Sequence, residues 1–296
     1  MNPQKRAVVE LVFAGAMWGF GFCAQKMAQE FWSPLVSLSL RFGFAFLLSL
    51  PLVLLMPSLR KIKLIDEARA ALVPGLLLGG VLGFQNYGLK FTSVANSGFI
   101  TTLYILFVPI YDALIFKQRI PKGHAKVVLV ALIGAAMMCE VHHMKLNLGD
   151  LLTLFCALLA GLQISWISWV APKIRSPFLF NTLQSFWIGL FSTVAALTLE
   201  TFRFSGAPLR SWFGAFHLVF FSSIVAFMIQ IRAQRILSSS TSSILFLLEA
   251  PFAALFGYWV FREALSPWQM MGGCLILAAC GWAILLERQT RSKTLA

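Results

Sequence analysis

Residues 237–263 read LSSSTSSILFLLEAPFAALFGYWVFRE, and this stretch decides the fold. Its apolar part is long enough to cross the hydrocarbon core of a bilayer, which takes about twenty residues at a rise of about 1.5 Å each. Counted from Ser240, Glu249 lies about 13 Å into the segment, which places its carboxyl group close to the bilayer midplane. A carboxylate at that depth normally faces a protein interior or a water-filled cavity.

Pro251 adds a second constraint to the same segment. Proline has no backbone donor, so the carbonyl of Leu247 loses its usual helical partner. That carbonyl must be satisfied inside protein, which means that the segment packs against other helices. Glu249 then has two interpretations. It is either a functional group that carries a proton or holds a substrate ammonium, or a structural carboxylate paired with a neighbour.

The whole chain has the composition of a polytopic membrane protein. Of its 296 residues, 59% are hydrophobic and 12% are charged, and a soluble domain of this size could not bury that much apolar surface. The formal net charge of +13 invites a nucleic-acid interpretation, but the cations sit in short loops between apolar runs rather than in one patch. We therefore expect a lipid bilayer, and no nucleic acid, among the partners.

Ten apolar runs with prolines at the joints predict an all-α polytopic membrane protein with ten transmembrane helices. The runs cover roughly residues 8–28, 34–56, 69–89, 94–116, 124–141, 150–171, 178–200, 212–235, 240–261 and 267–287. With both chain ends inside, 17 of the 24 Lys and Arg residues fall on the cytoplasmic side and six outside, and Arg41 lies within the second run. By the positive-inside rule we expect a multi-pass protein of the inner (plasma) membrane with both termini cytoplasmic.

The chain also repeats itself at an offset of about 140 residues, or five runs. LVFAGAMWGFG from Leu11 lines up with LLTLFCALLAG from Leu151, and NSGFITTLYILFVPIYDALIFKQR from Asn96 with STSSILFLLEAPFAALFGYWVFRE from Ser240. Because five is odd, the second copy enters the membrane from the opposite side. Inverted repeats of this kind are typical of secondary transporters with a substrate site near the midplane. We predict two inverted five-helix repeats, residues 1–145 and 146–296.

The order and spacing of several pieces resemble the EamA-type family of the drug/metabolite transporter superfamily. The resemblance rests on AMWGFGF at 16–22, LRF at 40–42, VANSGFITTLYILFVPI at 94–110, LGDLLTLFCALLAG at 148–161 and SSILFLLEAPFAALFGYWVFREAL at 242–265. The first repeat departs from the family at Lys117-Gln118-Arg119, where a Gly-Glu-Arg type of ending is usual. The resemblance implies a monomeric or homodimeric carrier that exports small metabolites, amino acids or drugs by alternating access. Proton coupling is a separate expectation, which rests on Glu249 carrying a proton.

Six side chains are predicted to bind the substrate: Trp18, Asn86, Tyr104, Gln163, Gln230 and Glu249. The amides lie at membrane depth, where they could bind substrate or equally join helices to one another. The two rings lie far from the interfacial belts, so they either wall a cavity or fill the core. The resemblance implies that helices one, three, four, six, eight and nine wall the cavity.

Two further charged groups are harder to place. Arg41 is about 10 Å inside the second run, and Glu10, Glu140 or a backbone carbonyl could be its partner. Asp112 lies about one turn from the end of the fourth run, where we expect Lys117 and Arg119 to solvate it at the interface.

No enzymatic site is evident in the sequence. The five cysteines are scattered through apolar runs without a CxxC pair, so we expect core packing and no metal; His142-His143 has no second ligand cluster, and no phosphate-binding loop is present. We expect no cofactor and no enzymatic activity. The alternatives to a carrier are a passive channel, or a membrane-embedded enzyme acting on lipid, which would need clustered His, Asp or Ser at one interface.

Overall fold

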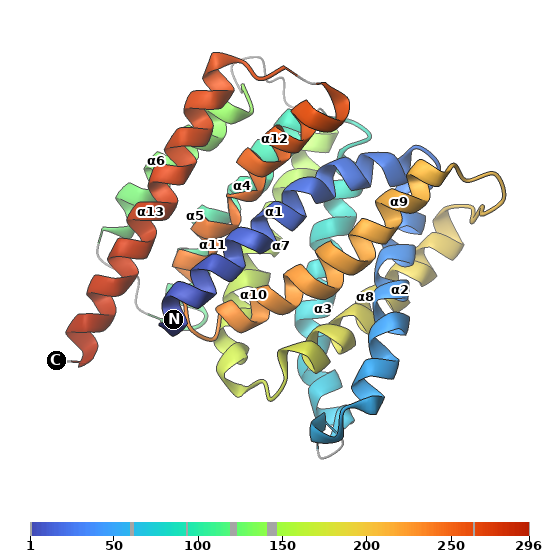
Figure 1. The fold of residues 1–296 in the computed structure, drawn as a ribbon, viewed down its shortest axis with the longest axis horizontal. Coiled ribbons are helices and arrows are strands. Elements are labelled where there is room, and N and C mark those ends of the chain that lie inside the picture. Colours follow the sequence, from blue (N-terminus) through green and yellow to red (C-terminus); the bar gives the residue numbers. More distant parts are fainter. Residues whose placement is uncertain are drawn as a thin grey trace.

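The computed structural model describes residues 2–59, 62–92, 94–118, 123–140, 147–262 and 264–295 (Figure 1). Within these residues, nine helical stretches are long and apolar enough to cross a membrane, and a tenth apolar helix, His124–Met138, is shorter. The ten stretches coincide with the ten predicted runs. The prediction of an all-α polytopic membrane protein is confirmed.

The first half contains five of these ten stretches. They are α1 (Pro3–Gln29), α2 (Pro34–Leu55), α3 (Leu64–Gly88), the consecutive helices α4 (Val94–Thr102) and α5 (Tyr104–Leu114), and α6 (His124–Met138), with the short 3-10 turn η1 (Pro57–Leu59) after α2. Proline stands in the first turn of α1 and α2, where its missing N–H has no helical partner to lose.

The second half repeats this order. It contains α7 (Leu148–Val170), a short turn η3 (Ala171–Lys173), α8 (Pro177–Leu199), the continuous run α9 (Leu209–His217), η4 (Leu218–Ala226) and α10 (Phe227–Ala233), then α11 (Ser239–Phe246) with α12 (Glu249–Phe261), and α13 (Pro267–Leu295). Asn147 and Asp150 form a capping box that fixes the start of α7. The predicted boundary between the halves falls in residues 141–146, which lie outside the described residues.

The fourth and ninth stretches are both broken a few residues before their prolines, Pro109 and Pro251. Leu103 separates α4 from α5, and Leu247 with Leu248 separates α11 from α12. Pro251 cannot donate to the Leu247 carbonyl, as predicted, and the carbonyl accepts instead from the backbone N–H of Ala250 at 3.0 Å in the turn at the break. The second half-helix therefore starts at Tyr104 in one stretch and at Glu249 in the other.

Packing between the halves is reciprocal. α1 packs against α12 and the α9–η4–α10 run, whereas α7 packs against α3, α4 and α5. Counterparts also meet directly, α2 against α8 and α6 against α13. In Figure 1, α6 and α13 form one flank of the molecule, α2 and α8 lie toward the other, and both chain ends lie at the lower left. Helices of both halves therefore line the centre of the molecule.

Glycine permits the tightest of these contacts. A Cβ on Gly134 in α6 would lie 2.8 Å from the carbonyl oxygen of Gly272 in α13, and a Cβ on Gly272 would lie 2.5 Å from that of Gly134. The two backbones therefore touch at this point, as small residues allow between membrane helices. Of the cysteines expected in the core, Cys23, Cys156 and Cys280 are buried, but Cys274 is exposed on the surface of α13.

Candidate functional site

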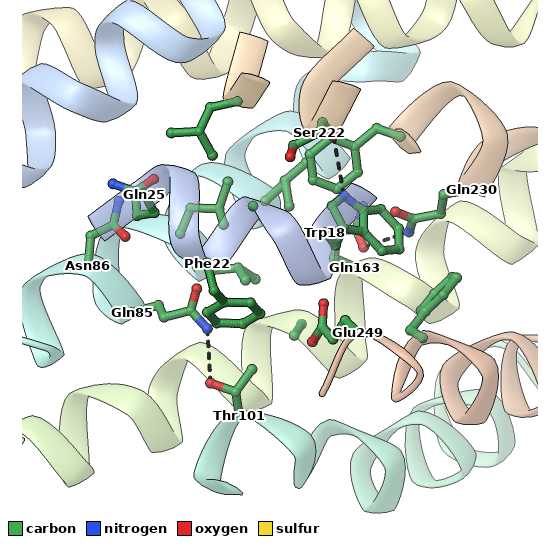
Figure 2. Close-up of a pocket in the computed structure, with 18 of the residues that line it drawn as sticks. Trp18, Phe22, Gln25, Gln85, Asn86, Thr101, Gln163, Ser222, Gln230 and Glu249 are labelled. Atoms are coloured by element: carbon green, nitrogen blue, oxygen red, sulfur yellow. Dashed lines mark hydrogen bonds between the residues drawn. The ribbon is translucent and has the colours of Figure 1, made fainter. Parts of the chain in front are cut away.

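A cavity of about 160 Å³ lies between the halves, beside the breaks in the fourth and ninth stretches (Figure 2). All six predicted site residues line it. The helices expected to wall it do so, and α2 adds Arg41. Side chains that the sequence analysis did not select also line it, among them Phe22, Gln25, Gln85, Thr101, Ser222, Phe227 and Phe246.

Glu249 is the first residue of α12, and its carboxylate points into the cavity (Figure 2). Within the part of the chain that the structure describes, no side-chain hydrogen bond or ion pair is formed by this carboxylate. Tyr104, the first residue of α5, is close enough to interact electrostatically with it. The Tyr104 hydroxyl is buried and has no hydrogen-bond partner among the described residues. The two half-helix starts thus bring an unpaired phenol and an unpaired carboxylate to one place.

Trp18 is held in position on two sides. Its indole Nε1 donates to the carbonyl oxygen of Ser222 at 3.2 Å, and its ring packs against Phe227 and Phe246 at centroid distances of 5.3 and 5.5 Å. One aromatic wall of the cavity is therefore fixed in orientation by a hydrogen bond. Trp18 both fills the core and faces the cavity, so the two interpretations of the sequence are not exclusive.

The predicted amides also line the cavity, and two of them join helices to each other. Gln230 donates from Nε2 to Oε1 of Gln163 at 3.3 Å, which joins α10 to α7 at the cavity wall. Asn86 is 6% exposed and lies near Gln25 in Figure 2. Gln184, by contrast, is buried in α8 and is not part of the lining. Three of these four amides therefore line the cavity, and the fourth packs between helices away from it.

Arg41 is the buried cation of the site, with 8% of its surface exposed. Its Nε donates to Ser223 Oγ at 2.7 Å, and its guanidinium carbon lies 5.1 Å from the ring centroid of Phe42 and 5.9 Å from that of Phe227. No carboxylate lies within 4 Å of it in the described residues. The partner that the sequence left open is a hydroxyl group with two rings, and not Glu10 or Glu140.

The two carboxylates that were considered as partners of Arg41 interact with other residues. Glu10 pairs with Arg232 of α10 at 2.6 Å and with Arg6 at 2.8 Å, and Glu140 accepts a hydrogen bond from Ser266. The Glu10–Arg232 pair ties the start of α1 to the end of α10, on the side of the chain termini. Gln25 and Asn86, which line the cavity, lie in the last turns of α1 and α3, toward the opposite side.

A π-helical segment, η4, borders the cavity where α1, α2 and α8 meet it. A π-helix displaces carbonyls from the regular α pattern, and such segments are frequent at functional sites. Here the carbonyls of Ser222, Ser223 and Ile224 accept hydrogen bonds from side chains, the first from Trp18 and the other two from Asn181 at 2.9 and 3.2 Å. Apolar periodicity does not reveal this segment, because its residues are as apolar as an ordinary helix.

The prediction that Asp112 lies at the membrane interface is wrong. It is 3% exposed and accepts a hydrogen bond from Ser239 of α11, so it faces the interior rather than the interface. Lys117 is exposed, and Arg119 lies outside the described residues. Asp112 does not line the cavity. Ser239 is 127 positions further along the chain, and no local pattern could identify it as the partner.

Sequence comparisons with known proteins point to one class of protein, the membrane transporters. The family model described as the EamA-like transporter family matches residues 5–139 and again residues 147–285. An "uncharacterized transporter" of Archaeoglobus fulgidus is 32% identical over 270 residues, 91% of this chain and 82% of that protein. The "uncharacterized transporter YyaM" of Bacillus subtilis is 23% identical over 277 residues, 90% of this chain and 88% of that protein.

The fold is also similar to that of solved structures, among them one crystal structure. It superposes with a TM-score of 0.79 at 16% sequence identity and covers 97% of this chain and 99% of its own. At that identity the likeness concerns the fold alone. Among the described residues, no three His, Cys, Asp or Glu side chains gather as metal ligands.

Proposed function

This chain belongs to the EamA-like transporter family, and from that premise we propose that it is a secondary transporter that exports small metabolites, amino acids or drugs by alternating access. The observation that carries the proposal is the cavity between the halves, in which Glu249 meets no ion-pair partner among the described residues. A carboxylate left without a partner at membrane depth costs several kcal/mol. A substrate cation or a proton would remove that cost.

The charges of the cavity favour a substrate that carries both signs. Arg41 and Glu249 both line the cavity, and within the described residues neither has a partner of opposite charge. A small molecule with an ammonium and a carboxylate group, such as an amino acid, would supply a partner to each. The rings of Trp18, Phe22 and Phe227 offer apolar surface to the rest of such a molecule.

The proposed orientation is supported by the charge pattern of the loops, and the proposed direction, export, by the family resemblance. The 17-to-6 distribution of Lys and Arg supports cytoplasmic termini and insertion in the inner (plasma) membrane. On that orientation the Glu10–Arg232 pair lies on the cytoplasmic side, and Gln25 and Asn86 line the cavity toward the outside. We propose that the chain works as a monomer or homodimer, with Glu249 exchanging a proton for the substrate.

Counterflow in liposomes tests the proposal. The purified protein is reconstituted, the vesicles are loaded with one unlabelled amino acid or cationic drug at a time, and entry of the labelled compound is followed. A carrier accelerates entry transiently when the same compound is present inside, because the loaded site returns faster. A passive channel shows no such acceleration, and equal entry of every compound with no effect of internal loading would contradict the proposal.

A matched pair of variants ties the result to the cavity. Gln163→Ala removes an amide that lines it, and Gln184→Ala removes a buried amide of α8 outside it. The first variant should change the preference among compounds, and the second should leave that preference unchanged at equal amounts of folded protein.

A further inference from the structure

Asp112 is a second buried carboxylate that the cavity does not use, and we propose that it binds a sodium ion together with the serine hydroxyls around it. It lies in the last turn of α5 and is 3% exposed. Ser239 donates to Oδ2, whereas Oδ1 is buried and has no hydrogen-bond partner among the described residues. The hydroxyls of Ser165 in α7 and Ser240 in α11 also lie beside the carboxylate.

Two other buried carboxylates show what a purely structural one looks like in this protein. Asp150 is equally buried, and both of its oxygens accept hydrogen bonds, from Thr92 Oγ1 at 2.5 Å and from the backbone N–H of Asn147 at 2.9 Å. Glu287 likewise accepts on both oxygens, from Ser238 and Thr241. Asp112 is as buried as Asp150, but its Oδ1 has no hydrogen-bond partner among the described residues. That oxygen is available to bind a cation.

The surroundings of Asp112 fit a hard monovalent cation. No Lys or Arg lies within 4 Å of the carboxylate in the part of the chain that the structure describes, so a buried negative charge there has no compensation from the protein. Carboxylate and hydroxyl oxygens are the ligands that hard cations prefer. One carboxylate and the three serine hydroxyls of Ser165, Ser239 and Ser240 supply up to four of them, and their single net charge matches Na⁺.

The site is separate from the substrate cavity but shares its elements. Asp112 and Tyr104 are both in α5, about 12 Å apart along the helix axis. Ser239 opens α11 and Glu249 opens α12, so one broken stretch reaches both sites. A bound Na⁺ would hold α5, α7 and α11 together on the side of the chain termini. The inference does not depend on which substrate the cavity takes.

Thermal unfolding of the full-length protein in detergent tests the site without a transport assay. NaCl is titrated at fixed pH, with choline chloride replacing it to keep the ionic strength constant. A ligand that binds the folded state raises the unfolding temperature in a saturable manner. We expect saturable stabilisation by NaCl and little by KCl in the native protein, loss of the NaCl effect in Asp112→Asn, and a rightward shift of the titration in Ser165→Ala.

Asp150→Asn is the matched control, because it makes the same change at an equally buried carboxylate whose oxygens are already paired; it should keep the sodium response. If Asp112→Asn yields no folded protein, binding of radioactive ²²Na⁺ to the native protein and to Ser165→Ala decides instead. A native protein that does not respond to Na⁺, or a response that persists in Asp112→Asn, would overturn the proposal. Stabilisation by low pH alone, lost in Asp112→Asn, would assign a proton to the site and overturn the sodium ion.

Discussion

At the scale of single residues, the cavity is defined by charged groups that have no oppositely charged partner among the described residues. Glu249→Gln keeps the shape of the side chain and removes the charge. If Glu249 exchanges a proton for a substrate ammonium, the variant should insert and fold normally but lose transport or its dependence on pH. In the native protein, binding should weaken as the pH falls, because a protonated carboxyl group does not attract an ammonium. Initial rates in liposomes across a range of pH measure this.

Asp66→Asn is the control for that variant, because Asp66 is exposed at the start of α3 and lies outside the cavity. It should transport like the native protein. A structural Glu249 would instead give less folded protein with unchanged transport per folded molecule. Full, pH-sensitive transport by a well-expressed Glu249→Gln variant would remove Glu249 from the mechanism.

Arg41 gives a second test at the same scale. Lysine in its place keeps the charge but loses the planar fork and the Nε hydrogen bond to Ser223. For a substrate that carries a carboxylate, Arg41→Lys should raise the KM about tenfold, equivalent to about 1.4 kcal/mol. For a cationic drug without a carboxylate, the KM should be little affected. An equal change for both kinds of compound would mean that Arg41 only supports the fold around η4.

At the scale of helices, the close contact between α6 and α13 requires a residue without a side chain at position 134. Gly134→Val would place side-chain atoms against the carbonyl of Gly272, where even a Cβ lies only 2.8 Å away. The helices must then separate, and overpacking of this kind costs about 1–3 kcal/mol. We expect a lower unfolding temperature in detergent. Gly281→Val in α13 is the control, because a Cβ there has nothing within 4 Å; an equal loss in both variants would contradict the prediction.

The helices themselves could be predicted because length, hydropathy and proline positions act locally. The depth of Glu249, counted from Ser240, sufficed to place it beside the cavity. The π-helical geometry of η4 and the environment of Asp112 could not be predicted, because both depend on partners from distant helices, Asn181 for the first and Ser239 for the second. The role of Arg41 stayed open for the same reason.

At the scale of the whole molecule, orientation in the membrane is testable by labelling. In a background without the five native cysteines, Ser205→Cys places a thiol in the exposed loop between α8 and α9, and Ser292→Cys places one near the C-terminus. A membrane-impermeant maleimide added to intact cells should modify the first and spare the second until the cells are opened. The reverse pattern would contradict cytoplasmic termini.

The proposed division into residues 1–145 and 146–296 makes a prediction about assembly. α1 packs against stretches of the second half, and α7 against stretches of the first, so neither half can cover its own inner surface. Expressed alone, each half should be degraded or aggregate; expressed together, they should form a complex that co-purifies and transports. A first half that is stable and monodisperse by itself would contradict this interlocked arrangement.

The start of α5 and the start of α12 occupy corresponding places in the two halves, yet one carries Tyr104 and the other Glu249. Two carboxylates at these places would repel each other and could hold two protons. With a phenol at one of them, a single exchangeable group remains at the centre. On the proposed mechanism, exchange at Glu249 is then limited to one proton or one ammonium at a time. The expected stoichiometry is one proton returned for each substrate molecule exported.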